Sequence, residues 1–277
     1  MPDIRLIALD LDGTLLTSEK KLTDENAAAL EACAKAGIEV VPATGRFYKG
    51  MPDTVRLLPY VHYVICINGA QVYDVRKDET VCASEIPWQR AVELMRFMDG
   101  LPVIYDCYQD GWGWMSQDMY DKAETYAANP HSLDMILRLR TPVPDLKETL
   151  SERKRGVQKV QMFFRDMDRR AEAFPLLREA FPDLEITTSI VNNIEINSRD
   201  ATKSVGLRKL AAYLGLDMKQ TMAFGDDLND VYVLRDAGVG VAMANGCPEA
   251  LEAADYVTGD CDRSGVAEAI RKLVLRH

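Results

Sequence analysis

The sequence predicts an α/β fold: a doubly wound parallel sheet of Rossmann-like type into which a second domain of α+β character is inserted. Strand-like apolar runs alternate with helix-like segments near both ends of the chain, a pattern typical of parallel sheets with helices on both faces. The middle of the chain instead contains hairpin-like and alternating segments. The length of 277 residues suits a core plus an inserted domain.

The N-terminal part of the core predicts one βαβ unit. Residues 4–9 form an apolar run interrupted only by Arg5, as expected for a strand that is buried on both faces. Thr23 is a candidate helix N-cap and Gly37 a candidate helix stop, so we expect a helix between them. Residues 38–44 then predict the next strand of the sheet.

The remaining core segments continue the alternation of strands and helices. A third apolar run, residues 63–70, ends in Asn-Gly-Ala, and residues 71–86 predict a hairpin. Apolar residues at helical spacing follow Lys203, and further strands are expected within residues 221–259. We therefore place the core at residues 1–83 and 191–277, and the inserted domain at residues 84–190.

Composition excludes some classes of partner and of location. The net charge of −10 opposes binding to nucleic acid, whose phosphates attract basic proteins. No apolar run is long enough to span a bilayer, and the N-terminus lacks the pattern of a secretory signal, so we expect a cytoplasmic protein. The six cysteines are scattered without any CxxC pair, which predicts neither a disulfide framework nor a zinc site.

Acidic residues gather where two predicted strands end. Asp10 and Asp12 follow the first strand, and the segment "GDDLND" adds Asp226, Asp227 and Asp230 after another. Alone, each group could be a solvated turn or a helix cap. Together they concentrate negative charge at the edge of the sheet where ligands bind in open α/β folds. Carboxylates from two loops suit Mg²⁺, which takes oxygen ligands.

Hydrogen-bond donors and cations accompany these acids. Thr44, Gly45 and Arg46 follow the second strand, and Lys203 begins a helix. A lone lysine at a helix start is usually solvated, but in combination with the acidic loops these groups suit a bound phosphate. We therefore expect the ligand to carry a phosphate group.

The order of these motifs resembles a known family. "DLDGT" (10–14), Thr44 in "ATGR", Lys203 and "GDDLND" (225–230) are similar to the four motifs of the haloacid dehalogenase-type phosphotransferases. Only the long stretch between Thr44 and Lys203 has room for the insert, as in the Cof-type (subfamily IIB) phosphatases, whose C2-type cap closes over small phosphorylated metabolites. The lysine lies in "DATKS", where the family pattern has glycine on its C-terminal side and a Gly-Val-Ser-like segment before it.

The resemblance implies a role for each acidic residue. Asp10 would be the nucleophile that takes the phosphoryl group, and Asp12 the general acid and base. Mg²⁺ would be held by Asp10, by the backbone carbonyl of Asp12 and by Asp226, while Asp230 would support these ligands from outside their shell.

The resemblance also implies the groups that hold the substrate. Thr44, Gly45, Arg46, Lys203 and Asn229 would bind or orient the phosphoryl group. Two alternatives stay open: a phosphomutase or phosphotransferase of the same fold, and a non-catalytic module that only binds phosphorylated ligands. Hexose phosphates, pyridoxal phosphate, flavin-pathway intermediates and nucleotides are all compatible substrates.

Overall fold

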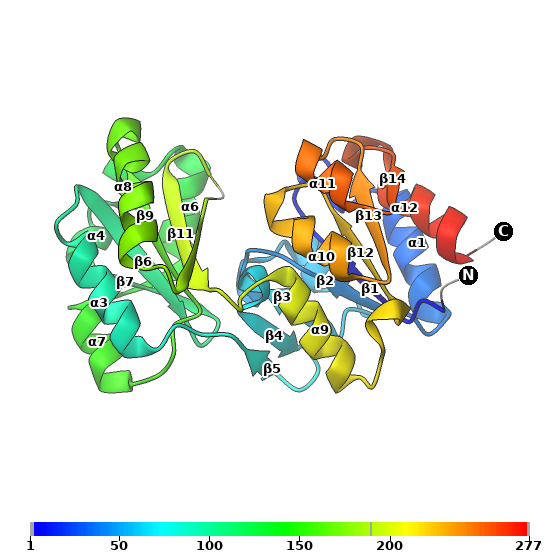
Figure 1. Ribbon diagram of the computed structural model, residues 1–277, viewed down its shortest axis with the longest axis horizontal. Helices are drawn as coiled ribbons and strands as arrows, with labels where there is room; N and C mark the ends of the chain where they lie inside the picture. Colours follow the sequence, from blue (N-terminus) through cyan, green and yellow to red (C-terminus); the bar gives the residue numbers. More distant parts are fainter. Residues whose placement is uncertain (1–2, 189, 276–277) are drawn as a thin grey trace. The chain divides into compact units, whose positions relative to one another are not determined.

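The computed structural model describes residues 3–188 and 190–275, which divide into two compact units (Figure 1). The core unit comprises Met1–Ala83 and Thr202–His277, and the inserted unit comprises Ser84–Ala201. The chain leaves the core unit at the end of a strand and re-enters it at Thr202, immediately before Lys203.

The core unit alternates strands with helices. Its strands are β1 (Leu6–Leu9), β2 (Glu39–Pro42), β3 (Tyr63–Cys66), β4 (Gln71–Asp74), β5 (Glu79–Ala83), β12 (Thr221–Gly225), β13 (Val239–Met243) and β14 (Tyr256–Thr258). Its α-helices are α1 (Asp24–Lys35), α2 (Asp53–Arg56), α9 (Lys203–Tyr213), α10 (Val231–Asp236), α11 (Pro248–Ala253) and α12 (Gly265–Ile270). Short 3₁₀ turns are η1 (Tyr48–Gly50), η2 (Ile67–Gly69), η3 (Met218–Gln220), η4 (Leu228–Asp230) and η5 (Cys261–Arg263), and a π-helical segment, η6 (Arg271–Leu275), follows α12.

The main core sheet is parallel, which confirms the predicted fold class. Its order is β14-β13-β12-β1-β2, with Leu9 opposite both Phe224 and Pro42. Helices α9 and α10 pack on one face, where Leu207, Leu210 and Val233 join the strand residues of the core, and α1 and α12 pack on the other (Figure 1). The carboxyl ends of β1, β2 and β12 therefore lie side by side.

The third apolar run extends this arrangement by one more strand. An isolated parallel bridge between Ala43 and Ile65 joins β3 to the end of β2. The expected hairpin is present, because β4 pairs antiparallel with both β3 and β5. Asn68 and Gly69 belong to the turn η2 that follows the strand, so the predicted strand ends earlier than residue 70.

The inserted unit is built on a mixed sheet in the order β10-β11-β9-β6-β7-β8. Its strands are β6 (Val103–Gln109), β7 (Trp112–Ser116), β8 (Arg140–Val143), β9 (Lys159–Phe164), β10 (Leu184–Thr187) and β11 (Asn193–Ser198). Its helices are α3 (Trp88–Met98), α4 (Gln117–Tyr120), α5 (Ala123–Tyr126), α6 (Pro130–Leu139), α7 (Leu146–Arg153) and α8 (Met167–Ala180). Residues of α3, α7 and α8 share one apolar cluster with the strands, as the α+β prediction requires.

The second boundary of the insert differs from the expected position. The sequence places it at residue 190, whereas the compact unit continues to Ala201. The reason is β11, which pairs with β10 and β9 and buries Ile194 and Ile196 in the apolar cluster of the inserted unit. Residues 191–201 therefore belong structurally to the insert.

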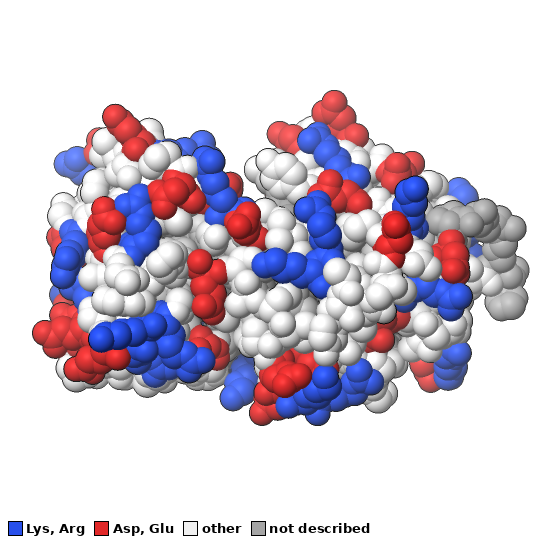
Figure 2. Space-filling model, turned by 60° about the horizontal axis from the view of Figure 1, so that its bottom comes forward, with Lys and Arg blue, Asp and Glu red and all other residues white. Residues whose placement is uncertain are grey.

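Lys and Arg are interspersed with Asp and Glu on the face drawn in Figure 2. None of the helices among the described residues combines the length and apolar character needed to cross a membrane. All six cysteines are free, and Cys33, Cys66, Cys107 and Cys261 are buried.

Candidate active site

The site lies at the carboxyl ends of three neighbouring strands, β1, β2 and β12. Asp10 follows β1 directly, and its backbone N–H donates to the Phe224 carbonyl of β12 at 3.1 Å. Asp226 follows β12, and Thr44 follows β2. Because these strands are parallel, their ends carry residues from distant parts of the sequence to one edge of the sheet.

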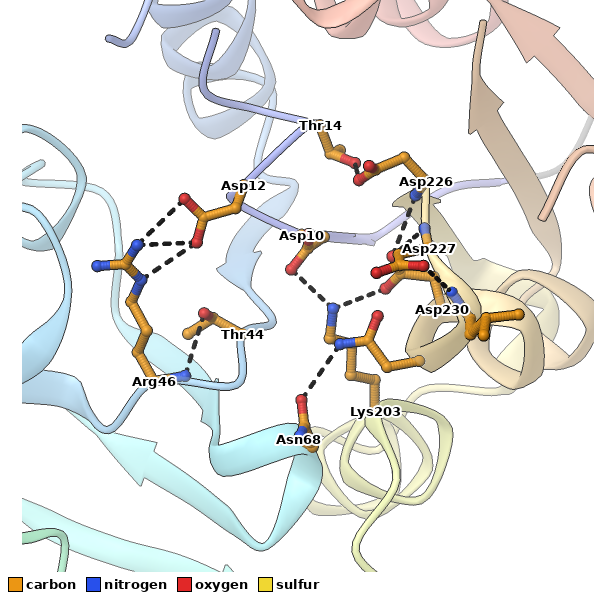
Figure 3. Close-up of polar contacts among 12 residues, drawn as sticks. Asp10, Asp12, Thr14, Thr44, Arg46, Asn68, Lys203, Asp226, Asp227 and Asp230 are labelled. Carbon is orange, nitrogen blue, oxygen red and sulfur yellow. Dashed lines mark hydrogen bonds and ion pairs between the residues drawn. The ribbon is translucent and has the colours of Figure 1, made fainter. Parts of the chain in front are cut away.

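Lys203 is the buried cation of the site. It is 1% exposed, and its Nζ donates to Asp10 Oδ1 and to Asp230 Oδ1, both at 2.7 Å (Figure 3). Thr202 caps α9 by accepting from the Val205 backbone N–H and so fixes where the helix begins. Burial disfavours the charged amine, but the two carboxylates outweigh burial and raise the pKa of Lys203.

Asp230 is held by donors on both carboxylate oxygens. Its Oδ1 accepts a hydrogen bond from the Lys203 ammonium. Its Oδ2 accepts from the backbone N–H groups of Asp226 and Asp227 at 3.0 and 3.2 Å. Asp230 therefore shapes the loop after β12 and links it to Lys203.

Asp226 is positioned by the first motif. The Thr14 hydroxyl donates to Asp226 Oδ1 at 2.6 Å (Figure 3). Gly13 has a φ of +87°, and a Cβ at this position would lie only 2.3 Å from Asp226 Oδ2. The backbone of the Asp10–Thr14 loop thus approaches the Asp226 carboxylate as closely as only glycine allows.

The three carboxylates Asp10, Asp226 and Asp230 form a donor set suited to a hard cation. One oxygen from each lies within 4.8 Å of the others. Burial is the largest of the effects that raise the pKa of Asp10 to about 7. The neighbouring carboxylates also raise it, whereas Lys203 lowers it. Burial likewise raises the pKa of Asp226 to about 6. A divalent cation would offset this crowding of like charge, so the donor set is consistent with the Mg²⁺ site of the family suggested by the motifs.

Asp12 lies apart from this carboxylate cluster. Its carboxylate accepts a forked contact from Arg46, with Nη2 at 2.9 and 3.1 Å and Nε at 3.2 Å (Figure 3). Lys20 Nζ also lies 2.9 Å from Asp12 Oδ1. Partial burial opposes ionisation, but these cations hold the pKa of Asp12 below its usual range. The two aspartates of the first motif therefore have different partners.

The loop after β2 is tied to the turn η2 and to the loop after β12. The Thr44 hydroxyl accepts from the Arg46 backbone N–H at 3.2 Å, and the Thr44 carbonyl accepts from the Asn68 N–H at 3.0 Å. Asn229 Nδ2 donates to Asn68 Oδ1 at 3.3 Å. A Cβ on Gly45 would come within 3.0 Å of the same oxygen, so a larger residue there would crowd the contact.

The structure brings several of the expected residues together. Asp10, Lys203, Asp226 and Asp230 share one cluster of contacts. The guanidinium of Arg46, which we expect to bind phosphate, pairs with Asp12 in this structure, and its role toward phosphate stays a prediction.

Three contributing residues were missed by sequence reasoning. Thr14 holds Asp226 and was visible inside "DLDGT". Asn245 donates to the Gly13 carbonyl at 2.8 Å and accepts from the Cys261 N–H at 2.9 Å; its place just after β13 was the available signal. Lys20 lies in a polar segment that carries no signal of its contact with Asp12.

The chain is similar to known proteins over almost its whole length. The family described as haloacid dehalogenase-like hydrolase matches residues 7–270. The 5-amino-6-(5-phospho-D-ribitylamino)uracil phosphatase of Bacillus subtilis is 31% identical, over 99% of this chain and 97% of that protein. The pyridoxal phosphate phosphatase of Escherichia coli is 29% identical, over 96% of this chain and 97% of that protein.

A solved structure described with the same family name shares the fold. A solved haloacid dehalogenase-like hydrolase from B. subtilis superposes with a TM-score of 0.81 at 28% identity, over 98% of this chain and all of that one. The motif order, the insert between Thr44 and Lys203 and these matches agree. The chain therefore belongs to the haloacid dehalogenase-like hydrolase family, as a phosphatase of the Cof type.

Proposed function

We propose that the protein is a Mg²⁺-dependent phosphatase that hydrolyses a small phosphorylated metabolite through an aspartyl-phosphate on Asp10. The observation that carries the proposal is the separation of the two aspartates of the first motif. Asp10 is 8% exposed and contacts the buried ammonium of Lys203, whereas Asp12 lies outside the carboxylate cluster and contacts Arg46 and Lys20. Two carboxylates in different environments suit two different roles.

Asp10 is the group placed to attack phosphorus. It lies at the end of β1, where the strand holds its backbone, and Lys203 fixes the direction of its carboxylate. The ammonium also offers positive charge beside the position of an incoming phosphoryl oxygen. Thr44 and Asn229 come from the two adjacent loops and are proposed to orient the remaining oxygens.

Asp12 is placed to move the proton. In phosphoester cleavage the leaving oxygen needs a proton, and in the hydrolysis of the aspartyl-phosphate a water must lose one. The cations beside Asp12 keep it ionised, as the step that takes a proton from water requires, whereas for the step that protonates the leaving oxygen Asp12 must first take up a proton. The Asp12 side chain lies outside the carboxylate cluster of Asp10, Asp226 and Asp230, which supports this assignment.

The carboxylates of Asp10 and Asp226, with the Asp12 carbonyl, would hold Mg²⁺. When bound, the ion neutralises charge on the phosphoryl group so that an anionic nucleophile can approach it. Thr14 orients Asp226, and Asp230 supports the loop that carries it. Each of these contacts is present in the protein itself, so the ligands are positioned before the ion arrives.

The inserted unit is proposed to act as the cap that selects the substrate. Its sheet carries a row of buried polar side chains on β6, β9 and β11, the face opposite the apolar cluster: Asp106, Tyr108, Lys159, Gln161 and Glu195. Asp106 Oδ1 has no hydrogen-bond partner among the described residues although it is buried. The other groups pair within the row, as Lys159 Nζ does with Glu195 Oε2 at 2.8 Å, so Asp106 Oδ1 is the atom that favours recognition of a polar organic group.

The relatives indicate the range of substrates to test. One is named for a phosphoribitylamino-uracil and another for pyridoxal phosphate, both small phosphate monoesters. We expect a panel that contains these compounds, sugar phosphates and nucleotides to reveal a preferred metabolite. A Gln161→Met variant is expected to change the relative kcat/KM values across the panel while an aryl phosphate is hydrolysed as before.

Rapid-quench labelling tests the two aspartate roles. With an activated, labelled phosphate donor, Asp10→Asn is expected to trap no phosphoryl-enzyme. Asp12→Asn is expected to form it and to hydrolyse it more slowly, by about 10²-fold or more. Label trapped on Asp10→Asn but not on Asp12→Asn would reverse the roles, and label on neither wild type nor variant would refute the covalent route.

A further inference from the structure

The side chain of Asn245 joins three segments of the core unit. Asn245 lies just after β13, and its Nδ2 donates to the Gly13 carbonyl at 2.8 Å. Its Oδ1 accepts from the backbone N–H of Cys261, in η5, at 2.9 Å. One side chain therefore connects the Asp10–Thr14 loop, the loop after β13 and the segment before α12.

A second asparagine makes the same pair of contacts two residues further along the chain. Asn26 Nδ2, in α1, donates to the Leu15 carbonyl at 3.1 Å, and its Oδ1 accepts from the Ala267 N–H of α12 at 3.0 Å. Asn26 is fully buried, whereas Asn245 is exposed. Both asparagines tie a carbonyl in or beside the first motif to residues 261–267, so this segment supports the loop through two separate side chains.

The loop that carries Asn245 also contacts the segment after β12, the neighbouring strand in the sheet. The Cys247 N–H donates to the Asp226 carbonyl at 2.8 Å. A Cβ on Gly246 would lie 3.2 Å from the same oxygen and 3.4 Å from the Asp226 Cα. Residues 244–247 therefore contact both of the loops that carry the proposed metal ligands.

The contact at Gly13 restrains a part of the backbone that glycine would leave free. Gly13 has a φ of +87°, and glycine exchanges such a conformation for others at little cost. Its carbonyl belongs to the peptide that leads into Thr14, whose hydroxyl holds Asp226 Oδ1 at 2.6 Å (Figure 3). The like charges of Asp10 and Asp226 oppose the close approach of the two loops. A hydrogen bond that fixes this peptide favours the approach.

We propose that Asn245 is a positioning residue for the metal site, which holds the Gly13–Thr14 peptide so that the loop of the first motif stays against Asp226. The inference rests on the proposed Mg²⁺ site. The side-chain oxygen of Asn245 already accepts from the Cys261 N–H, and its amide group donates to the Gly13 carbonyl. Asn245 therefore acts through the backbone and is not assigned to the ion or to the substrate.

The test measures Mn²⁺ binding by electron paramagnetic resonance, because Mn²⁺ takes the same carboxylate, carbonyl and water ligands as Mg²⁺. Asn245→Ala removes both contacts, whereas Asn245→Asp keeps an acceptor for the Cys261 N–H and offers no donor to Gly13. Asn129→Ala is the matched control: Asn129 is an exposed asparagine of the inserted unit, and its Oδ1 accepts from the Ser132 N–H at 2.9 Å. Urea unfolding of the same samples measures the stability that each variant loses.

We expect Asn245→Ala to bind Mn²⁺ about tenfold more weakly than the wild type, since residues that orient metal ligands typically contribute about 10- to 100-fold to affinity. Asn245→Asp should also bind more weakly, although an added carboxylate by itself attracts the cation. Asn129→Ala should keep the wild-type affinity while it loses a helix cap, because a lower stability alone does not change the affinity of the folded protein.

Other results would overturn the inference. Wild-type affinity in Asn245→Ala would show that the contact is not needed, and wild-type affinity in Asn245→Asp alone would assign the effect to the Cys261 contact. An equal loss in Asn129→Ala would indicate a general effect of stability. Asp226→Asn separates the two proposals: if it binds Mn²⁺ as the wild type does, the proposed metal site fails, whereas weaker binding there with no change in Asn245→Ala refutes this inference alone.

Discussion

Gly13→Ala is expected to disable the enzyme without unfolding it. An added Cβ would lie 2.3 Å from Asp226 Oδ2, whereas ordinary contacts at such a position begin at 3.4 Å. The Asp226 carboxylate must therefore move by about 1 Å, a displacement that can cost about 10²-fold in rate when it affects a positioned catalytic group. Because Thr14 binds the other oxygen at 2.6 Å, the movement also strains that hydrogen bond.

The effect on stability is expected to be smaller and can be measured separately. Gly13 has a φ of +87°, where alanine is strained by about 1–2 kcal/mol. Gly37 offers a matched control, since its φ is +79° and an added Cβ would meet nothing within 4 Å. Gly37→Ala should therefore lower the free energy of unfolding by a similar amount but leave the carboxylates in place.

The assay is steady-state hydrolysis of an aryl phosphate at several Mg²⁺ concentrations, with urea unfolding of the same samples. We expect both variants to lose similar free energy of unfolding. Only Gly13→Ala should lose activity by about 10²-fold, with a higher Mg²⁺ requirement. Wild-type turnover in Gly13→Ala, or an equal loss of activity in Gly37→Ala, would refute the assigned role of the close approach to Asp226.

Three further outcomes are expected. Chelation should abolish turnover, and Mg²⁺ should raise the Tm more at pH 8 than at pH 5.5. Because the pKa of Asp10 is raised to about 7, the metal-free fold loses stability as the pH rises from about 4 to 7, and the cation binds the ionised form. An equal rise of the Tm at both pH values would contradict this. Arg140→Met should lower the free energy of unfolding in urea by about 3–5 kcal/mol, because it leaves the buried Asp106 carboxylate without the Arg140 Nε donor at 2.6 Å. A loss below about 1 kcal/mol would contradict that pairing. Cys66, whose thiol pKa is raised by burial, should resist alkylation of the native protein at pH 8, whereas the partly exposed Cys247 should react first in peptide mapping.

The sequence alone was sufficient for the features that depend on local pattern. The runs that became β1, β2 and β12 are apolar because both faces of a parallel sheet are covered, and this leaves a periodicity that can be recognised without contacts. The acidic groups at the strand ends are equally local, and Asp10 and Asp226 meet because parallel strands end at one edge. The family resemblance followed from the order of these motifs.

The tertiary structure decided what depends on pairing between distant segments. The strand β11 alternates like any half-buried strand, and only its pairing with β9 and β10 places it in the inserted unit. The partners of Asp12 were equally hidden, because Lys20 reaches it through a turn held by Asp262, more than two hundred residues away. Side-chain pairing of this kind arises from the geometry of the folded chain, and local composition and periodicity carry no record of it.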